Sequence, residues 1–182
     1  YPVADKAHAI KVSFSSQEWC GHVYAQLNNR EKFEVATHSY FESVGDTMVT
    51  INKAILENEI WNKIRISPDN LPTGDLKIIP SLEYFRLTHK DLKHYDAIAS
   101  LTNTDGITSY KIEYPELERT LIINFKSTFP YIIESWTDSF KDGYGEKAKM
   151  LISKATKIKT IKSPYWKKSS NEFLPLRDSL GL

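Results

Sequence analysis

Cysteine is almost missing from this sequence, because Cys20 is the only one in 182 residues. One cysteine excludes a disulfide within the chain and a Cys-x-x-Cys metal or redox site. Long apolar runs are missing too, since none approaches the roughly 18 residues that a membrane-spanning helix needs. The formal net charge is only +1, so no overall field points to nucleic acid or to a membrane surface.

Common catalytic and nucleotide-binding motifs are also absent. The sequence has no Walker loop, no Gly-x-Gly-x-x-Gly, no Gly-x-Ser-x-Gly and no His-Glu-x-x-His. Glu57 and Glu59 are two positions apart on a predicted helix, so their carboxylates point to different sides and do not form an acid–base pair. These absences favour a binding role over an enzyme, and no cofactor or metal is expected.

Aromatic residues and period-two patterns are what the sequence does have. Tyr, Trp and Phe make up 12% of the chain, which favours strands over helical bundles. Ile10, Val12 and Phe14 alternate with polar residues, as they do in a half-buried strand. We expect a long strand within 8–42, bent near Gly21 and paired with a second one. Further strands are predicted at 76–89 (interrupted at Pro80), 95–103, 107–114, 119–126 and 150–162, while 132–140 fits a helix or a strand.

One helix is predicted, over residues 52–65. Leu56, Ile60 and Ile64 repeat at i, i+4 and i+8, Asn52 is a suitable N-cap, and Pro68 lies beyond the end. The predicted fold is therefore mainly β, an antiparallel curved sheet or open barrel-like structure with one amphipathic helix near 52–65. We expect residues 1–182 to form a single domain.

A possible thiol site lies in "QEWCGH", where Gln17, Cys20 and His22 are close in sequence. Thiol catalysis needs a thiolate, usually favoured by a helix N-terminus or an imidazolium. In an ideal strand, Cys20 and His22 would be about 7 Å apart, too far for direct proton transfer. A bulge at Gly21 would change that distance. The pattern favours a small buried thiol in a sheet, with a reactive thiol as the alternative.

A second candidate site lies in "HKDLKHYD", where His89, Asp91 and His94 have nitrogen and oxygen ligands that suit zinc. Their spacing matches no strong metal motif. The segment is more typical of a polar turn between strands, so no metal site is predicted.

The third candidate is the basic stretch 147–168, which has eight lysines and no acidic residue. Of 24 basic residues in the chain, 16 then remain against 23 acidic ones. Lysine often guards an exposed edge strand, and the alternative is a surface for anionic lipid, polysaccharide or a protein partner. The stretch has no arginine, and no nucleic acid is expected. The residues considered for a ligand or partner surface are Trp19, Tyr24, Lys157, Lys159, Tyr165 and Trp166.

Five segments of the chain carry a family resemblance: "SSQEWCGHVYAQLNNR", "SYFES", "ILENEIWNKIRISPDNLPTGD", "IIPSLEYFRL" and "SPYWKK". Over these segments the chain resembles a family of predicted envelope lipoproteins of flavobacteria, often labelled "septum formation inhibitor Maf". The resemblance implies a longer precursor, of which this chain is the C-terminal part. It also implies a location in the cell envelope, in the periplasm or at the outer membrane, through a lipid anchor upstream of this segment.

The activity in the family label does not follow. True Maf proteins are nucleotide pyrophosphatases with an α/β fold and a "SxSPRR"-like segment, which this sequence lacks. We therefore expect a non-enzymatic envelope β domain that binds an apolar or glycan ligand or an envelope protein. A thiol-dependent enzyme at Cys20 is the alternative, and nucleotide hydrolysis is the second alternative.

Overall fold

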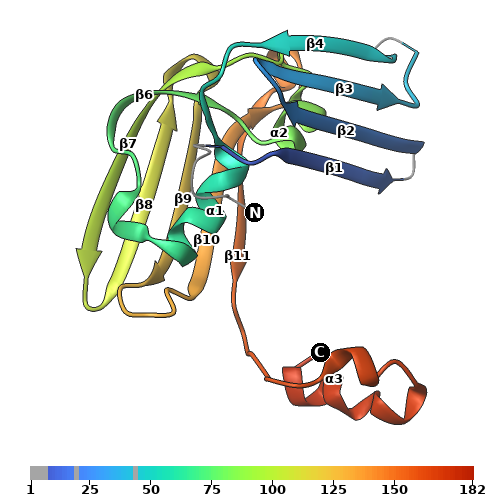
Figure 1. The fold of residues 1–182 in the computed structure, drawn as a ribbon, viewed down its shortest axis with the longest axis vertical. Coiled ribbons are helices and arrows are strands. Elements are labelled where there is room, and N and C mark those ends of the chain that lie inside the picture. Colours follow the sequence, from blue (N-terminus) through green and yellow to red (C-terminus); the bar gives the residue numbers. More distant parts are fainter. Residues whose placement is uncertain (1–7, 19–20, 43–44) are drawn as a thin grey trace.

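The computed structural model describes residues 8–18, 21–42 and 45–182. The strands of this part of the chain form two β-sheets (Figure 1). The smaller sheet has the order β1 (Lys11–Glu18), β2 (Gly21–Asn29), β3 (Phe33–Ser39) and β4 (Thr47–Ile51). The larger has the order β11 (Lys149–Thr156), β10 (Ile133–Asp142), β9 (Arg119–Lys126), β8 (Ile107–Tyr114), β7 (Tyr95–Thr104), β6 (Gly74–Ile79) and β5 (Ile55–Leu56). Every pairing described is antiparallel except that of β5 with β6. The prediction of a mainly antiparallel β fold is confirmed.

Two helices lie where the sheets meet (Figure 1): α1 (Glu57–Ile66) and α2 (Leu82–Thr88). The predicted helix therefore exists but begins five residues later than expected. Ile55 and Leu56 are extended instead, because they pair with Ile78 and Ile79 of β6. A third helix, α3 (Pro175–Leu180), lies near the C-terminus. None of the helices described is long and apolar enough to cross a membrane.

The prediction of one long strand bent near Gly21 is wrong. Strands β1 and β2 are separate and pair antiparallel, with Glu18 opposite Gly21. Strand β3 continues the meander from β2.

The prediction of a strand over 76–89 is wrong in its second half. Strand β6 ends at Ile79, and α2 follows because the Ser81 hydroxyl accepts a hydrogen bond from the Tyr84 amide at 3.2 Å. Leu82, Tyr84 and Phe85 then bury one side of this short helix. Three other predicted strands agree closely with β7, β8 and β9, and most of 132–140 lies in the strand β10. The predicted last strand over 150–162 is wrong beyond residue 156, because β11 covers only Lys149–Thr156.

The inward faces of both sheets and the two helices share one hydrophobic core. Alternation along β9 places Leu121, Ile123 and Phe125 in it, as the period-two pattern predicts. The other side chains that are almost completely buried come from β2, β3, α1, β6 and β8: Leu27, Phe33, Val35, Ile60, Ile64, Ile78, Ile79, Tyr110, Ile112 and Tyr114. The helices thus hold the sheets together along one part of their faces.

Replacing Gly21 with alanine should lower the free energy of unfolding by about 2 kcal/mol. Gly21 has a φ of 129°, which L-residues rarely adopt, and an added Cβ would lie 2.7 Å from the Cβ of Tyr40. The backbone of Tyr40 is tied down, because its amide donates to the His22 carbonyl at 3.1 Å. Urea unfolding would measure the loss.

Gly106→Ala is the matched control. Gly106 also has a positive φ, of 79°, but it has open space around the added Cβ. The free energy of unfolding of this variant should therefore fall only by the cost of backbone strain, about 1 kcal/mol. Equal losses for the two variants would contradict a steric requirement at Gly21.

Candidate binding cleft

A cleft of about 380 Å³ lies between the inward face of the four-stranded sheet and α2 with the turn that follows it. Its walls are mainly apolar. The residues that line it are Phe14, Val23, Tyr24, Ala25, Thr37, His38, Ser39, Thr47, Val49, Leu82, Phe85, Arg86, His89, Lys90, Asp91 and Leu92.

Small side chains on the sheet explain why this space is open. Phe14 pairs with Ala25, and Ala25 pairs with Thr37, so these three lie on one face of adjacent strands. Farther along the same face, Leu27 and Val35 form another pair, and both are buried in the core. The face is therefore filled at one end and open at the end where its side chains become small.

Helix α2 and its C-terminal turn form the opposite wall. His89 ends the helix in the left-handed conformation, and its amide donates to the Phe85 carbonyl at 2.9 Å. The next turn is tied to β7, since the Tyr95 hydroxyl donates to the Asp91 carbonyl at 2.8 Å. The turn after α2 is thus anchored to the larger sheet.

Charged groups gather on the α2 side of the cleft. Arg86 lies with its guanidinium carbon 5.1 Å from the centre of the Phe41 ring, within range of a cation–π interaction. Lys90 and Asp91 follow on the exposed turn beside His89. The rim on this side therefore carries the cationic side chains of Arg86 and Lys90 beside the Asp91 carboxylate.

A buried ion network lies next to the cleft helix, centred on Arg119 of β9. The guanidinium donates to both oxygens of Glu57 at 2.7 and 2.9 Å, and to both oxygens of Asp138 at 2.8 Å. The Tyr114 hydroxyl donates to Glu57 at 2.7 Å. On α2, the Tyr84 ring centre lies 4.2 Å from the guanidinium carbon. The network therefore connects α1, β9, β10 and the helix that forms the cleft wall.

Burial and charge shift the pKa values of Arg119 and Tyr114 in this network. Burial opposes the charge on Arg119, but the Glu57 carboxylate and the hydrogen bonds to Asp138 outweigh it and raise the pKa of Arg119 above its usual value. Burial, followed by the negative charge of Glu57, raises the pKa of Tyr114 far above its usual value. Arg119 therefore remains charged and Tyr114 neutral at ordinary pH, which keeps the hydrogen bonds of both to Glu57.

The predicted thiol site is only partly described. Gln17 and His22 face each other across the β1–β2 hairpin, and both are exposed. Cys20 and Trp19 lie outside the described residues, so the thiol site stays a prediction. Tyr24, on β2, stacks on His38 with ring centres 6.2 Å apart at the border of the cleft.

The other candidate residues fall in two places. His89 and Asp91 lie at the cleft rim, and no group of three metal-ligating side chains occurs within the part of the chain that the structure describes. Lys157 directly follows β11 and still pairs with Glu134 of β10. Lys159, Tyr165 and Trp166 come after it, on the segment that runs away from both sheets (Figure 1). Tyr24 and the basic segment therefore do not share one surface.

The sequence reasoning missed Arg86, Arg119 and Asp138. Arg119 and Asp138 have no local signal, because they meet Glu57 only in the folded chain. Arg86 could have been found from the α2 pattern that Ser81 begins. Comparison of the chain with protein-family models, with curated proteins and with solved structures found no match.

Proposed function

We propose that this chain is a non-enzymatic binding domain whose cleft accepts a small amphipathic ligand. The apolar part of the ligand would lie on Phe14, Ala25 and Val49, and its anionic head would lie at Arg86 and Lys90. The observation that carries the proposal is the combination of an apolar floor with cationic side chains, Arg86 and Lys90, at the rim. Ligand sites typically have volumes of about 300–1,000 Å³ and a few polar groups at an apolar surface, and this cleft fits that description.

The proposal includes a location in the cell envelope. It is supported by the resemblance to envelope lipoproteins over the segments quoted above. An envelope binding domain would meet amphipathic molecules with acidic heads, which agrees with the chemistry of the cleft.

Laurate is a suitable probe, and Thr37→Leu should weaken its binding by at least about tenfold. Thr37 lies in the open part of the sheet face, so a larger apolar side chain there would occupy the cleft. Isothermal titration calorimetry would measure the affinity, and thermal unfolding would show that the variant is folded.

The matched control is Thr102→Leu, at an exposed position of β7 outside the cleft lining. It should leave laurate binding unchanged. Arg86→Gln with Lys90→Gln should weaken laurate but not dodecanol, which has no charge for the rim to attract. The proposal would be abandoned if neither compound bound, or if both threonine variants had the same effect.

A further inference from the structure

The segment that follows β11, residues 157–182, exposes an unusual amount of apolar surface. We call this segment the arm. No residue of the arm is buried, although the structure describes all of it. Ile158 and Tyr165 are each 77% exposed and Trp166 is 68% exposed, and Leu174 and Leu182 are exposed as well. Such surface on a folded protein marks a place of contact with something else.

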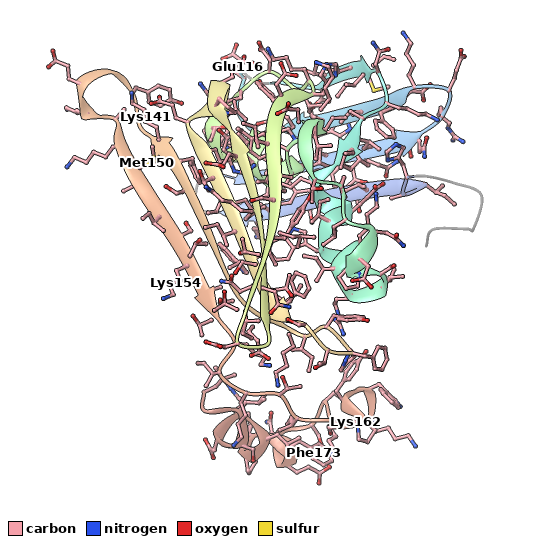
Figure 2. All side chains as sticks on the ribbon, turned by 90° about the vertical axis from the view of Figure 1, so that its left-hand side faces the viewer. Glu116, Lys141, Met150, Lys154, Lys162 and Phe173 are labelled. Atoms are coloured by element: carbon pink, nitrogen blue, oxygen red, sulfur yellow. The ribbon has the colours of Figure 1, made fainter. Side chains whose placement is uncertain are left out.

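The arm projects from the body of the protein. Figure 1 shows it leaving the end of β11 and finishing in short helical turns well away from both sheets. Figure 2, seen from the side, places Lys162 and Phe173 at this far end, and Met150 and Lys154 along the strand that leads to it. A broad flat partner could therefore meet the arm without colliding with the sheets.

Positive charge accompanies this apolar surface. The eight lysines of 147–168 are interrupted by no acidic residue. In the described part of the chain, Lys157 is the one among them that forms an ion pair, with Glu134 at 2.6 Å. Lys159, Lys162 and Lys167 are exposed. The partner that complements this arm is thus both anionic and able to take up apolar side chains.

The residue types distinguish between anionic partners. Tyr and Trp favour the boundary between water and lipid, and lysine can bury its aliphatic stem there while its ammonium stays in the headgroup layer. Nucleic-acid recognition usually employs arginine, and the arm has a single arginine, Arg177, against five lysines. A second copy of this chain is a poorer complement, because carboxylates such as Asp96, Glu113 and Glu116 already pair with lysines of the body.

We propose that the arm docks this protein on the surface of a bilayer that contains anionic phospholipid. Trp166 and Tyr165 would enter the headgroup region, and the lysines around them would be attracted to the lipid charge. This contact is independent of the ligand proposed for the cleft.

Co-flotation of the full chain with vesicles tests the proposal. The protein should bind vesicles of phosphatidylcholine mixed with phosphatidylglycerol, and should not bind pure phosphatidylcholine. Binding should weaken as salt is raised, because exposed charges are screened. A joint change to glutamine at Lys159, Lys162, Lys167 and Lys168 should reduce binding by at least about tenfold.

The matched control changes the same number of lysines on the body to glutamine: Lys11, Lys32, Lys53 and Lys126. It has the same net charge as the arm variant and should bind as the unmodified protein does. Trp166→Ala should also weaken binding and should remove the blue shift of tryptophan emission that vesicles cause in the unmodified protein.

Three results would overturn the proposal. One is equal loss of binding in the body and arm variants, which would indicate a general charge effect. Another is binding of a single-stranded oligonucleotide through the same four lysines when vesicles do not bind. The third is a dimer, seen by sedimentation without vesicles, that the arm variant abolishes while vesicles remain unbound.

Discussion

Replacing Arg119 with methionine should lower the free energy of unfolding by about 3–5 kcal/mol. The change leaves Glu57 buried with a negative charge and no cation beside it, while Asp138 loses the same partner. The Tyr114 hydroxyl would remain as a donor to Glu57, but a neutral hydrogen bond does not balance a buried charge. Urea unfolding followed by circular dichroism would measure the difference.

Two further variants show whether the cause is an unpaired buried charge. Lys77→Met breaks the exposed pair between Lys77 and Asp96, which should change the free energy of unfolding far less, because water screens that pair. Joint replacement of Glu57 by leucine, Arg119 by methionine and Asp138 by leucine leaves no unpaired charge. This triple variant should be more stable than Arg119→Met alone. A loss at Arg119 no greater than the loss at Lys77 would contradict a stabilising role for the network.

The folded state should also lose its stability between about pH 10 and pH 12, because buried tyrosines resist ionisation. Burial, with smaller contributions from the charges of Asp91 and Glu116, raises the pKa of Tyr95 to about 12. Burial also raises the pKa of Tyr84, Tyr110 and Tyr114.

The direction of this effect follows from proton binding. An unfolded tyrosine loses its proton near pH 10, whereas these four keep theirs in the folded state. Below pH 10 their contribution to stability is complete, and it is lost as the pH rises toward the folded-state pKa values. Unfolding in urea at a series of pH values would measure the fall, and tyrosinate absorbance would show these side chains ionising together with unfolding.

Tyr110→Phe separates this cause from general alkaline damage. The Tyr110 hydroxyl donates to the Pro72 carbonyl at 2.7 Å, so the variant is less stable at neutral pH, but its stability should fall less steeply above pH 10. Tyr165→Phe, at an exposed position, should leave the slope unchanged. Identical slopes in all three proteins would count against the tyrosine explanation.

The alternation of apolar and polar residues predicted the middle of the larger sheet well. Strands β7, β8 and β9 are joined by short turns, and each has one buried face. The β1–β2 hairpin was missed although the sequence contains a signal for it. Val12 and Phe14 are at even positions, whereas Val23, Ala25 and Leu27 are at odd ones. A continuous strand keeps its buried residues in one phase, so this shift requires a turn or a bulge.

The candidate site depends on features that local patterns do not contain. Helix α2 was missed because Tyr84 and Phe85 favour strands, and because its seven residues are too few for a clear helical period. The cleft arises from the way that helix meets the smaller sheet. The ion network joins residues as far apart in sequence as Glu57 and Arg119, so only the folded chain defines it.

Tyr84 holds the cleft helix α2 against the buried ion network. Its ring lies against the Arg119 guanidinium, while its neighbour Phe85 faces the cleft. Moving α2 outward would pull this ring from a cation that is held by two carboxylates. The cleft wall is thus preorganised, and a ligand that fits it does not spend binding energy on reshaping the site.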